Sequence, residues 1–587
     1  MRKKTTFFFI ALTVLSMVFT GANLVKADEV DPFADVVPFI FGTGSSPPGF
    51  DPLAVYDSTS GDILMQHTEG LFSFNYSDPA LGLEPRLAVD MGTWNDAGTE
   101  WTIEIRKDVL FHDGTAMKAS DVKWNWDRLN TLSADDLCDH ASLWFNDEAE
   151  LILNRTEEID DYTIKFVLNK AWKDFELLQS FWGCYIIKPQ TDKEDDLIGG
   201  DELDLIVGTG PFVLDEYVAG EKTVFVANND YYRGAPDIQK LIFQIYASGT
   251  AYNNAFLAKE AHVIPYVYFD NWAAVSADIN LDYYLRTLPV CFFYHLNVHN
   301  IDWPVRKAMQ YAYNYPYLIA SVWDNVYLEH HTPVPAGMIG YNPDLEGLPY
   351  YNITLAREYL INDETYGYGD AIDALVTAGT LNISDDDSWK ALAASDPLAT
   401  HNFTHYGTGL QYQLIDNMEY CGISVVDNVV GDWGTFLHSN LEDLEIVMGG
   451  WGPDYFHPIN QIEPLFGTQA SANYNGLNDT AIDALMGQAH TLTGAALETK
   501  IDEIVTAIIV EEAAAMYYTQ RRRAIGWVSE VVSNVNDLFN GNGDPYFYNV
   551  EFALSDPPAT GIPGFTMISL ALSAVGTAAF LFLRKRK

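Results

Sequence analysis

The sequence is poor in positive charge and in cysteine, and both shortages limit what the chain can do. It has 33 lysine and arginine residues against 81 aspartate and glutamate residues, which gives a formal net charge of −48. Such a chain repels nucleic acid and anionic membrane surfaces, so we expect no nucleic-acid partner. The four cysteines include no Cys-x-x-Cys pair, which argues against a zinc or redox motif. If the chain lies outside the cell, one or two disulfides can form, and we favour the pair Cys138 and Cys184.

Signatures of catalysis are also missing. There is no Gly-x-Ser-x-Gly, no His-Glu-x-x-His and no Walker loop. We therefore predict a protein that is not an enzyme, with no catalytic residue, no cofactor and no metal site. His330-His331 beside Glu329, and His401 with His405, are the metal ligands that we considered and set aside. A surface glycosidase stays open as an alternative, because the many carboxylates include no pair that the sequence alone places across a cleft.

Two apolar segments mark the ends of the chain. Residues 1–27 begin with Arg2, Lys3 and Lys4, followed by an apolar run and small residues near Ala27, the pattern of a secretion signal. A first transmembrane helix is the alternative, although the run is short for one. Residues 562–583 are nearly all apolar and long enough to cross a bilayer, and the basic tail 584–587 follows them. Because basic residues favour the cytoplasmic side, we expect the region before the stalk 556–561 to lie outside the cell.

The last apolar segment contains Pro563-Gly564-Phe565, which resembles the sorting tails of archaeal surface proteins. In those proteins the segment is cut and replaced by a lipid, and an uncleaved anchor is the alternative here. Six Asn-x-Ser/Thr sequons fit a glycosylated exterior. They begin at Asn75, Asn154, Asn352, Asn382, Asn402 and Asn478.

Between the two ends, strand patterns alternate with helix patterns, which is typical of an α/β protein. Residues 362–405 interrupt the alternation with an acidic run and several glycines, and we interpret them as an insertion. We expect strands at 37–41, 101–106, 163–168 and 241–246, a hairpin within 208–227, helices that begin at Ser120, Pro304 and Asn352, and a last helix over 498–515.

The stretch from Ile446 to Pro458 is the candidate ligand-binding segment. It begins as a short alternating strand, and Gly449-Gly450 then removes side-chain bulk before a turn at Gly452-Pro453. Trp451 and Asp454 are left at the mouth of this turn. An indole beside a carboxylate can stack on a ligand and pair with an amine. The alternative is an ordinary turn at the end of a strand, with Trp451 filling the core.

Several short motifs together resemble the extracellular solute-binding proteins of ABC transporters, in the family of the oligopeptide and dipeptide binders, with an archaeal source expected from the sorting tail. Each motif is weak alone, but their order extends over roughly residues 37–550. They are Glu84-Pro85-Arg86-Leu87-Ala88, Phe111-His112-Asp113-Gly114, Ala119-Ser120-Asp121-Val122, Gly208-Thr209-Gly210-Pro211-Phe212, Asn229-Asp230-Tyr231-Tyr232, Val305-Arg306-Lys307-Ala308, Pro335-Ala336-Gly337, and Gly450-Trp451 with Asp454-Tyr455.

The resemblance implies a two-lobed periplasmic-binding-protein-like fold of type II, close to cluster C, with mixed sheets. The chain would cross between the lobes near residues 265–285 and 490–515. The expected parts are a signal peptide 1–27, lobe I at 28–275 with an extra subdomain at about 60–190, lobe II at 276–500 with the insertion 362–405, a return to lobe I at 501–555, the stalk, the anchor and the tail.

The resemblance also implies a function. A membrane-anchored monomer on the cell surface would capture di- or oligopeptides and deliver them to a permease with a cytoplasmic ATPase. In peptide-binding relatives the aspartate pairs with the ligand's amino terminus, which carries over to Asp454, while Gly450 offers backbone hydrogen bonds and Trp451 lines a side-chain pocket. His457-Pro458 stands where the family often has Asp-Pro, so an oligosaccharide or another solute, and a sensory role, stay open.

Overall fold

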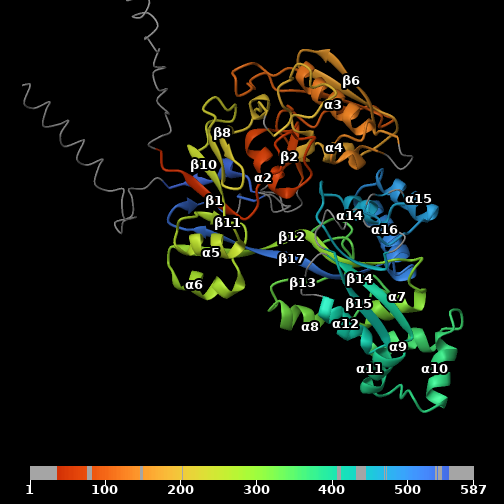
Figure 1. The fold of residues 1–587 in the computed structure, drawn as a ribbon. Coiled ribbons are helices and arrows are strands. Elements are labelled where there is room, and N and C mark those ends of the chain that lie inside the picture. The colour runs from red at the N-terminus through yellow and green to blue at the C-terminus, as the bar shows by residue number, and fades with distance from the viewer. Residues whose placement is uncertain are drawn as a thin grey trace, which may run out of the picture.

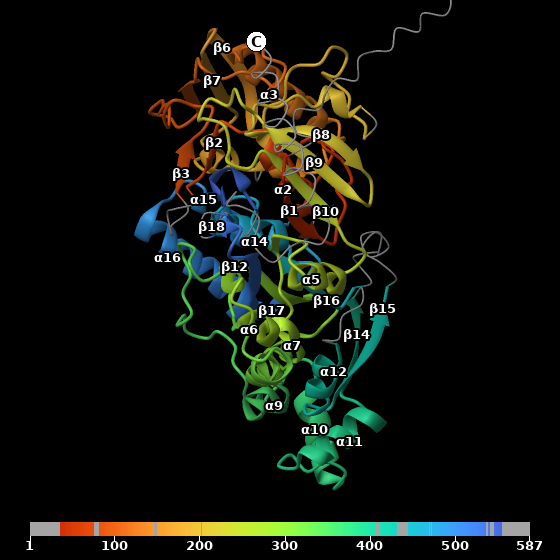
Figure 2. The ribbon, with the colours of Figure 1, turned by 90° about the vertical axis from the view of Figure 1, so that its left-hand side faces the viewer.

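The computed structural model describes residues 36–75, 82–145, 150–200, 202–405, 411–430, 444–468, 470, 472–533, 535, 538–539 and 545–553. The expected secretion signal, stalk, anchor and basic tail lie outside these ranges. The described chain forms two lobes, which Figure 1 and Figure 2 show from two sides. Within it, no helix is both long and apolar enough to cross a bilayer.

A mixed eleven-stranded sheet extends through both lobes. Its strands are β1 (Phe39–Thr43), β8 (Phe212–Val218), β9 (Lys222–Ala227), β10 (Lys240–Ile245), β11 (Val263–Ile264), β12 (Leu281–Leu296), β13 (Leu328–Glu329), β14 (Ala399–His405), β15 (Ile423–Val429), β16 (Ile446–Trp451) and β17 (Ala515–Val528). The order is β15-β14-β16-β12-β17-β11-β1-β10-β9-β8, and β13 pairs with β17 off this path. β1 is parallel to β10 and β11, and β14 is parallel to β15 and β16, while the other pairs are antiparallel. The expected α/β class with a mixed sheet is confirmed.

The first lobe carries an additional four-stranded sheet in the order β4-β5-β7-β6. In β5 the buried Trp101 and Ile103 alternate with more exposed residues, as the sequence predicts. Ser120 does not cap the next helix: Lys118 occupies that position, and its backbone N–H donates to Asp121 at 2.7 Å. The elements of this lobe outside the large sheet are α2 (Ser58–His67), β2 (Phe72–Phe74), β3 (Leu83–Pro85), β4 (Thr93–Trp94), β5 (Glu100–Glu104), α3 (Ala119–Ala134), β6 (Leu153–Asp160), β7 (Thr163–Leu168), α4 (Phe175–Leu178), α5 (Gly249–Leu257), α6 (Trp272–Ala277), β18 (Val532–Ser533) and β19 (Glu551–Phe552).

The second lobe packs its helices against the β14–β16 end of the large sheet (Figure 1). Asn352 caps α9 as predicted, because its side chain accepts from the N–H of Leu355 at 3.0 Å. The helix expected over 498–515 is shorter: α16 ends at Val505, a π-helical turn follows, and β17 begins at Ala515. Ala513 has a φ of 51°, a left-handed conformation that cannot continue a helix. The helices of this lobe are α7 (Trp303–Ala312), α8 (Tyr315–Tyr317), α9 (Ile353–Ile361), α10 (Tyr368–Thr377), α11 (Asp386–Ser395), α12 (Gln411–Glu419), α14 (Pro458–Phe466), α15 (Thr480–Ala489) and α16 (Gly494–Val505).

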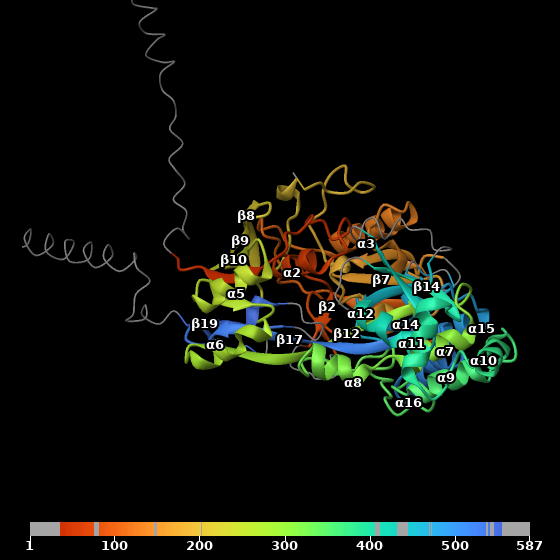
Figure 3. The same ribbon diagram turned by 60° about the horizontal axis from the view of Figure 1, so that its bottom comes forward.

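The long strands β12 and β17 carry the chain from one lobe to the other (Figure 3). Leu281 packs in a core of the first lobe, whereas Cys291 on the same strand packs in a core of the second. Likewise, Tyr518 belongs to the second lobe and Ala524 to the first. We therefore infer lobe boundaries inside these two strands, later in the chain than residues 276 and 501.

All four cysteines are buried and free. Cys138 and Cys184 lie in the same hydrophobic core, as their sequence neighbourhood suggested, but they do not form the expected disulfide. The thiol of Cys184 donates instead to the carbonyl of Leu178 at 3.0 Å.

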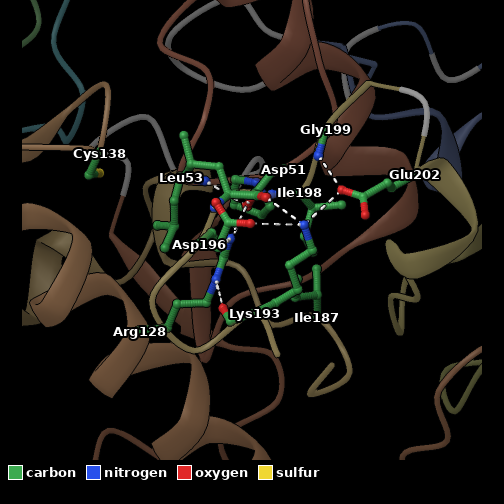
Figure 4. Close-up of polar contacts among 12 residues, drawn as sticks. Asp51, Leu53, Arg128, Cys138, Ile187, Lys193, Asp196, Ile198, Gly199 and Glu202 are labelled. Carbon is green, nitrogen blue, oxygen red and sulfur yellow. Dashed lines mark hydrogen bonds and ion pairs between the residues drawn. The ribbon is translucent and has the colours of Figure 1, made fainter. Parts of the chain in front are cut away.

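A buried ion pair holds the loop after β1 in place (Figure 4). The carboxylate of Asp51 accepts two hydrogen bonds from the guanidinium of Arg128 at 3.0 and 2.5 Å, and neither side chain is more than 2% exposed. The same carboxylate accepts from the backbone N–H groups of Leu53 and Ile198. Because every lone pair has a donor, the pair fixes the short segment that leads to Tyr56 and Asp57.

Replacing Asp51 by alanine should lower the free energy of unfolding by about 3–5 kcal/mol, because the charge of Arg128 would stay buried without its partner. Urea unfolding of the full-length protein measures this change. The matched control is Asp108→Ala, which removes the exposed partner of Arg106 and should change stability by less than about 1 kcal/mol. Equal effects of the two substitutions would contradict a structural role of the Asp51 pair.

Candidate functional site

A cavity of about 850 Å³ lies between the two lobes. Its size is within the range of roughly 300–1,000 Å³ that is usual for small-molecule sites. Both lobes and β17 contribute to its wall. The residues that line it include Tyr56, Asp57, Phe181, Trp182, Tyr252, Tyr266, Tyr268, Leu288, Val290, Trp451, Pro453, Asp454, Arg521 and Arg523.

Trp451 lies at the last position of β16 and lines this cavity. Its indole N–H donates to the carbonyl of Asn460 in α14 at 2.7 Å, so the ring has a fixed orientation. One part of the ring packs on the second-lobe core and another part reaches the cavity. Trp451 therefore combines both interpretations of the sequence, a core residue and a wall residue.

Asp454 joins the two lobes through its carboxylate. Oδ1 accepts from the phenol of Tyr56 in the first lobe at 2.9 Å, and Oδ2 accepts from the side chain of Asn460 at 3.1 Å. Burial raises the pKa of Asp454 to about 6, against the opposing effect of these hydrogen bonds. An ionised carboxylate has about four acceptor positions, so two remain for a donor inside the cavity.

Gly450 is not among the residues that line the cavity. It lies opposite Phe292 in the β12–β16 ladder, and a Cβ added at this position would come within 2.8 Å of the Phe292 ring. The absence of a side chain is thus explained by packing inside the sheet. The backbone role that the sequence predicts for Gly450 stays a prediction.

Aromatic residues that the sequence did not single out cover the first-lobe side of the cavity. Trp182 approaches α2 closely because Gly61 has no side chain: a Cβ there would lie 2.6 Å from the indole nitrogen. Tyr252, Tyr266 and Tyr268 come from the segments around α5 and β11. None of these residues stands in a recognisable motif, so only the folded arrangement reveals them.

Asp57 adds a second carboxylate to the cavity wall. Its Oδ1 caps α2 by accepting from the N–H of Ser60 at 3.0 Å. Its Oδ2 is inaccessible to solvent and has no hydrogen-bond partner among the described residues. A buried carboxylate oxygen without a donor is costly, so this position favours a ligand that donates.

A buried histidine cluster connects the start of α4 in the first lobe with α14 and α15 of the second. His490 pairs with Asp174 through Nδ1 at 2.7 Å and with Glu463 through Nε2 at 2.9 Å, and Trp172 stacks on its ring. Burial alone would lower the pKa of His490, but the charges of Glu463 and Asp174 outweigh burial and raise it to about 10. The neighbouring His457, 3.3 Å from Asp174, has a pKa lowered by burial. His490 is therefore the cation of this contact between the lobes.

The other histidines named from the sequence have ordinary partners. His331 pairs with Glu329, and His330 stacks on Tyr341. His401 pairs with Glu445, and His405 pairs with Asp427. In the part of the chain that the structure describes, no group of three or more histidine, cysteine or acidic side chains is arranged to hold a metal ion.

Comparison with known sequences gives one family. Residues 82–473 match the profile of the bacterial extracellular solute-binding proteins, family 5 Middle. Heme-binding protein A of Haemophilus influenzae is 23% identical over 504 residues, which cover 81% of this chain and 85% of that protein. The dipeptide-binding protein of Escherichia coli is 24% identical over 494 residues, which cover 79% and 86%.

Solved structures agree on the fold. The periplasmic binding protein DppA of Helicobacter pylori, in complex with the peptide STSA, superposes with a TM-score of 0.69 at 20% identity, covering 88% of this chain and 98% of that one. NikA of Brucella suis, in complex with Fe(III)-EDTA, superposes with a TM-score of 0.69 at 20% identity, covering 87% and 99%. The expected two-lobed periplasmic-binding-protein-like fold is confirmed.

The histidine cluster predicts a specific pH dependence of stability. Because the pKa of His490 is raised in the folded protein, its contribution is fully present below about pH 6.5 and is lost as the pH rises through about 10. The loss should be on the order of 3–5 kcal/mol in the free energy of unfolding. Urea unfolding between pH 6.5 and 10 should show this decrease in the wild type and a much smaller one in His490→Gln. The exposed His299 provides the control His299→Gln, which should keep the wild-type slope. A wild-type slope in His490→Gln would contradict the assignment.

Proposed function

This chain belongs to the bacterial extracellular solute-binding proteins of family 5, and we propose that it captures short peptides between its two lobes and delivers them to the permease of an ABC importer. The family consists of binding proteins rather than enzymes, so the chain binds its solute and does not transform it. The expected family and the expected absence of catalysis are thereby confirmed.

One observation carries the choice of peptides. Asp454 stands on the wall of the inter-lobe cavity, is held by Tyr56 of the other lobe, and keeps acceptor positions for a cationic donor. An amino terminus is such a donor, and Trp451 beside it supplies an apolar face for a side chain. The names of relatives include a dipeptide-binding protein, which supports a peptide ligand, and a heme-binding protein, which shows that relatives also bind other solutes.

The sequence and the family membership support three further parts of the proposal: the location on the cell surface, the membrane anchor and the transport partners. The signal pattern at 1–27 and the apolar segment at 562–583 support the proposal that the lobes lie outside the membrane and are joined to it by the C-terminal segment. The archaeal sorting tail remains part of this proposal. We further propose that a monomer meets the permease, with its cytoplasmic ATPase, through the closed lobes.

The ligand class is tested by incubating the full-length protein with an equimolar pool of di- to pentapeptides and, separately, with a pool of oligosaccharides. Mass spectrometry of the retained molecules should recover peptides. Retention of sugars alone would overturn the peptide assignment while leaving the family unchanged. Release of a chemically altered pool would contradict binding without turnover.

Replacing Asp454 by asparagine should weaken the binding of a retained peptide by about 2–5 kcal/mol, because the peptide's ammonium group would lose its charged partner. Isothermal titration calorimetry measures this change. The N-acetylated form of the same peptide is the matched control, and the substitution should leave its weak binding unchanged. An equal loss for both forms would show that Asp454 does not hold the amino terminus.

The raised pKa of Asp454 predicts how binding depends on pH. Below about pH 6 the carboxylate gains a proton and its attraction for an ammonium group is lost, while the amino terminus itself stays charged. The affinity for a free-amine peptide should therefore fall about tenfold between pH 7 and pH 5. In Asp454→Asn this fall should disappear. A pH-independent affinity in the wild type would contradict ionisation of Asp454 as the cause.

A further inference from the structure

The six Asn-x-Ser/Thr sequons differ in how much of each one the fold leaves accessible. Glycan transfer needs the amide nitrogen of the asparagine and the hydroxyl of the third residue within reach of one enzyme, so both groups must lie at the surface. The structure describes five of the six sequons completely, because residues 76 and 77 of the sequon at Asn75 lie outside the described ranges. These five can therefore be compared side chain by side chain.

Two sequons are closed by the sheets that contain them. In β14 the side-chain amide of Asn402 donates to the carboxylate of Glu445 at 2.7 Å, and Thr404 is only 3% exposed. In β6 Asn154 is exposed, but Thr156 is only 4% exposed and its hydroxyl donates to a carboxylate of α3 at 2.5 Å. An enzyme cannot reach both groups of either sequon without opening the sheet.

A third sequon is held at the start of a helix. Asn352 is half-buried, its Oδ1 caps α9, and its backbone N–H donates to the carbonyl of Tyr311 at 2.8 Å. The other two residues of this sequon, Ile353 and Thr354, already belong to α9. The amide nitrogen is therefore less accessible here than it would be in an open loop.

The sequon at Asn382 is open at all three residues. It lies in the loop between α10 and α11, and Asn382, Ile383 and Ser384 are all exposed. The Oδ1 of Asn382 accepts from the backbone N–H of Ser384 at 3.1 Å, which joins the two residues in one tight turn. Neither the Nδ2 of Asn382 nor the hydroxyl of Ser384 has a hydrogen-bond partner among the described residues. The fold thus leaves unused the two groups that glycan transfer requires.

The sequon at Asn478 is open for the same reasons. Asn478 and Thr480 are exposed, and their side chains have no hydrogen-bond partner in the described part of the chain. Asp479 between them caps α15 with its own carboxylate, so the cap does not need Asn478. Because α15 extends from Thr480 to Ala489, the sequon lies one helix length, about 15 Å, from His490 at the contact between the lobes.

Both open sequons lie where a glycan would not obstruct binding. Figure 1 and Figure 2 show α10 and α11 at the end of the second lobe that lies farther from the first lobe. No residue of either open sequon lines the inter-lobe cavity. A bulky polar group at these positions would therefore leave the entry of a ligand and the contact between the lobes unhindered.

We propose that Asn382 and Asn478 carry N-linked glycans, whereas Asn154 and Asn402 stay unmodified although they also stand in sequons. The donor is an oligosaccharide linked through phosphate to a membrane lipid. In the transfer, the Nδ2 of the asparagine forms a bond to C1 of the first sugar and loses one proton. The bond between C1 and the phosphate oxygen breaks, and the lipid phosphate leaves with its electron pair, so nothing is oxidised or reduced. The proposal uses the external location of the lobes, which is part of the proposed function, but not the choice of ligand.

The test is glycopeptide mass spectrometry of the full-length protein, purified from the membranes of the organism that makes it. Peptides that contain Asn382 or Asn478 should carry the added mass of a hexose-containing oligosaccharide in most copies. Peptides that contain Asn154 or Asn402 should appear only at their unmodified mass. Unmodified Asn382 and Asn478 would overturn the proposal, and a glycan at Asn154 or Asn402 would overturn selection of sites by the folded structure.

Ser384→Ala removes only the hydroxyl of one open sequon. It should abolish modification of Asn382 and leave that of Asn478 unchanged, and the protein should migrate faster than the wild type in denaturing electrophoresis. Ser384→Thr, which keeps a hydroxyl, should retain the glycan. The matched control is Ser395→Ala, which removes the hydroxyl of an exposed serine in the same insertion but outside any sequon. A glycan that persists on Asn382 in Ser384→Ala would contradict the assignment.

Protease added to intact cells separates failure of this proposal from failure of the external location. Cleavage of the lobes in intact cells, together with unmodified Asn382 and Asn478, would reject the glycans and leave the proposed function standing. Protection of the lobes until the cells are lysed would instead reject the external location, and with it both the glycans and the proposed capture of solutes outside the cell.

Discussion

The pairing of β12 with β17 is the constraint on which the rest of the structure depends. These two strands are the route by which both lobes are joined, and they are hydrogen-bonded to each other over nearly their whole length. Their ladder is irregular between Thr287 and Cys291, where the carbonyl of Pro289 accepts from Gln461 and cannot be matched by an N–H on the same residue. The irregularity places Leu288 and Val290 in the cavity wall next to Arg521. The site therefore lies where the shared sheet departs from regular pairing.

Two charged residues, Asp454 and His490, make contacts between the lobes, and burial shifts their pKa values in opposite directions: it raises that of Asp454 and lowers that of His490. At Asp454 desolvation raises the pKa by more than the hydrogen bonds from Tyr56 and Asn460 lower it, so the pKa is about 6. At His490 two carboxylates more than compensate, and the pKa rises to about 10. The first contact is thus mostly ionised at physiological pH but loses its charge just below it, whereas the second stays fully charged. A group near its pKa responds to a ligand's charge, which suits Asp454 to recognition and His490 to holding the lobes together.

Elements with strong local patterns were predictable from the sequence, and those fixed by distant contacts were not. The strand at 163–168 and the cap at Asn352 follow from alternation and from side-chain chemistry within a few residues. β17 was missed: the helix expected over 498–515 reaches only its first residue, Ala515, and its strand conformation depends on β12, more than 200 residues away. Trp451 and Asp454, which line the cavity, could be singled out because they share one turn. Tyr56, Asp57 and the arginines were missed because their meeting point exists only in the fold, although three consecutive arginines in so acidic a chain were a usable signal.

The contacts between the lobes also differ in whether they are complete without a ligand. His490 has an acceptor on each ring nitrogen, and Tyr455 is buried in the first-lobe core although it comes from the loop after β16. These contacts favour the closed arrangement whatever the cavity holds. Asp57 has a buried oxygen without a donor, and Arg521 has a buried nitrogen without an acceptor. A ligand shifts a conformational equilibrium only through groups that it satisfies in one state and not in the other. Selectivity must therefore come from the unsatisfied groups of the cavity wall. The histidine cluster stabilises the closed arrangement equally for every ligand, so it does not contribute to selectivity.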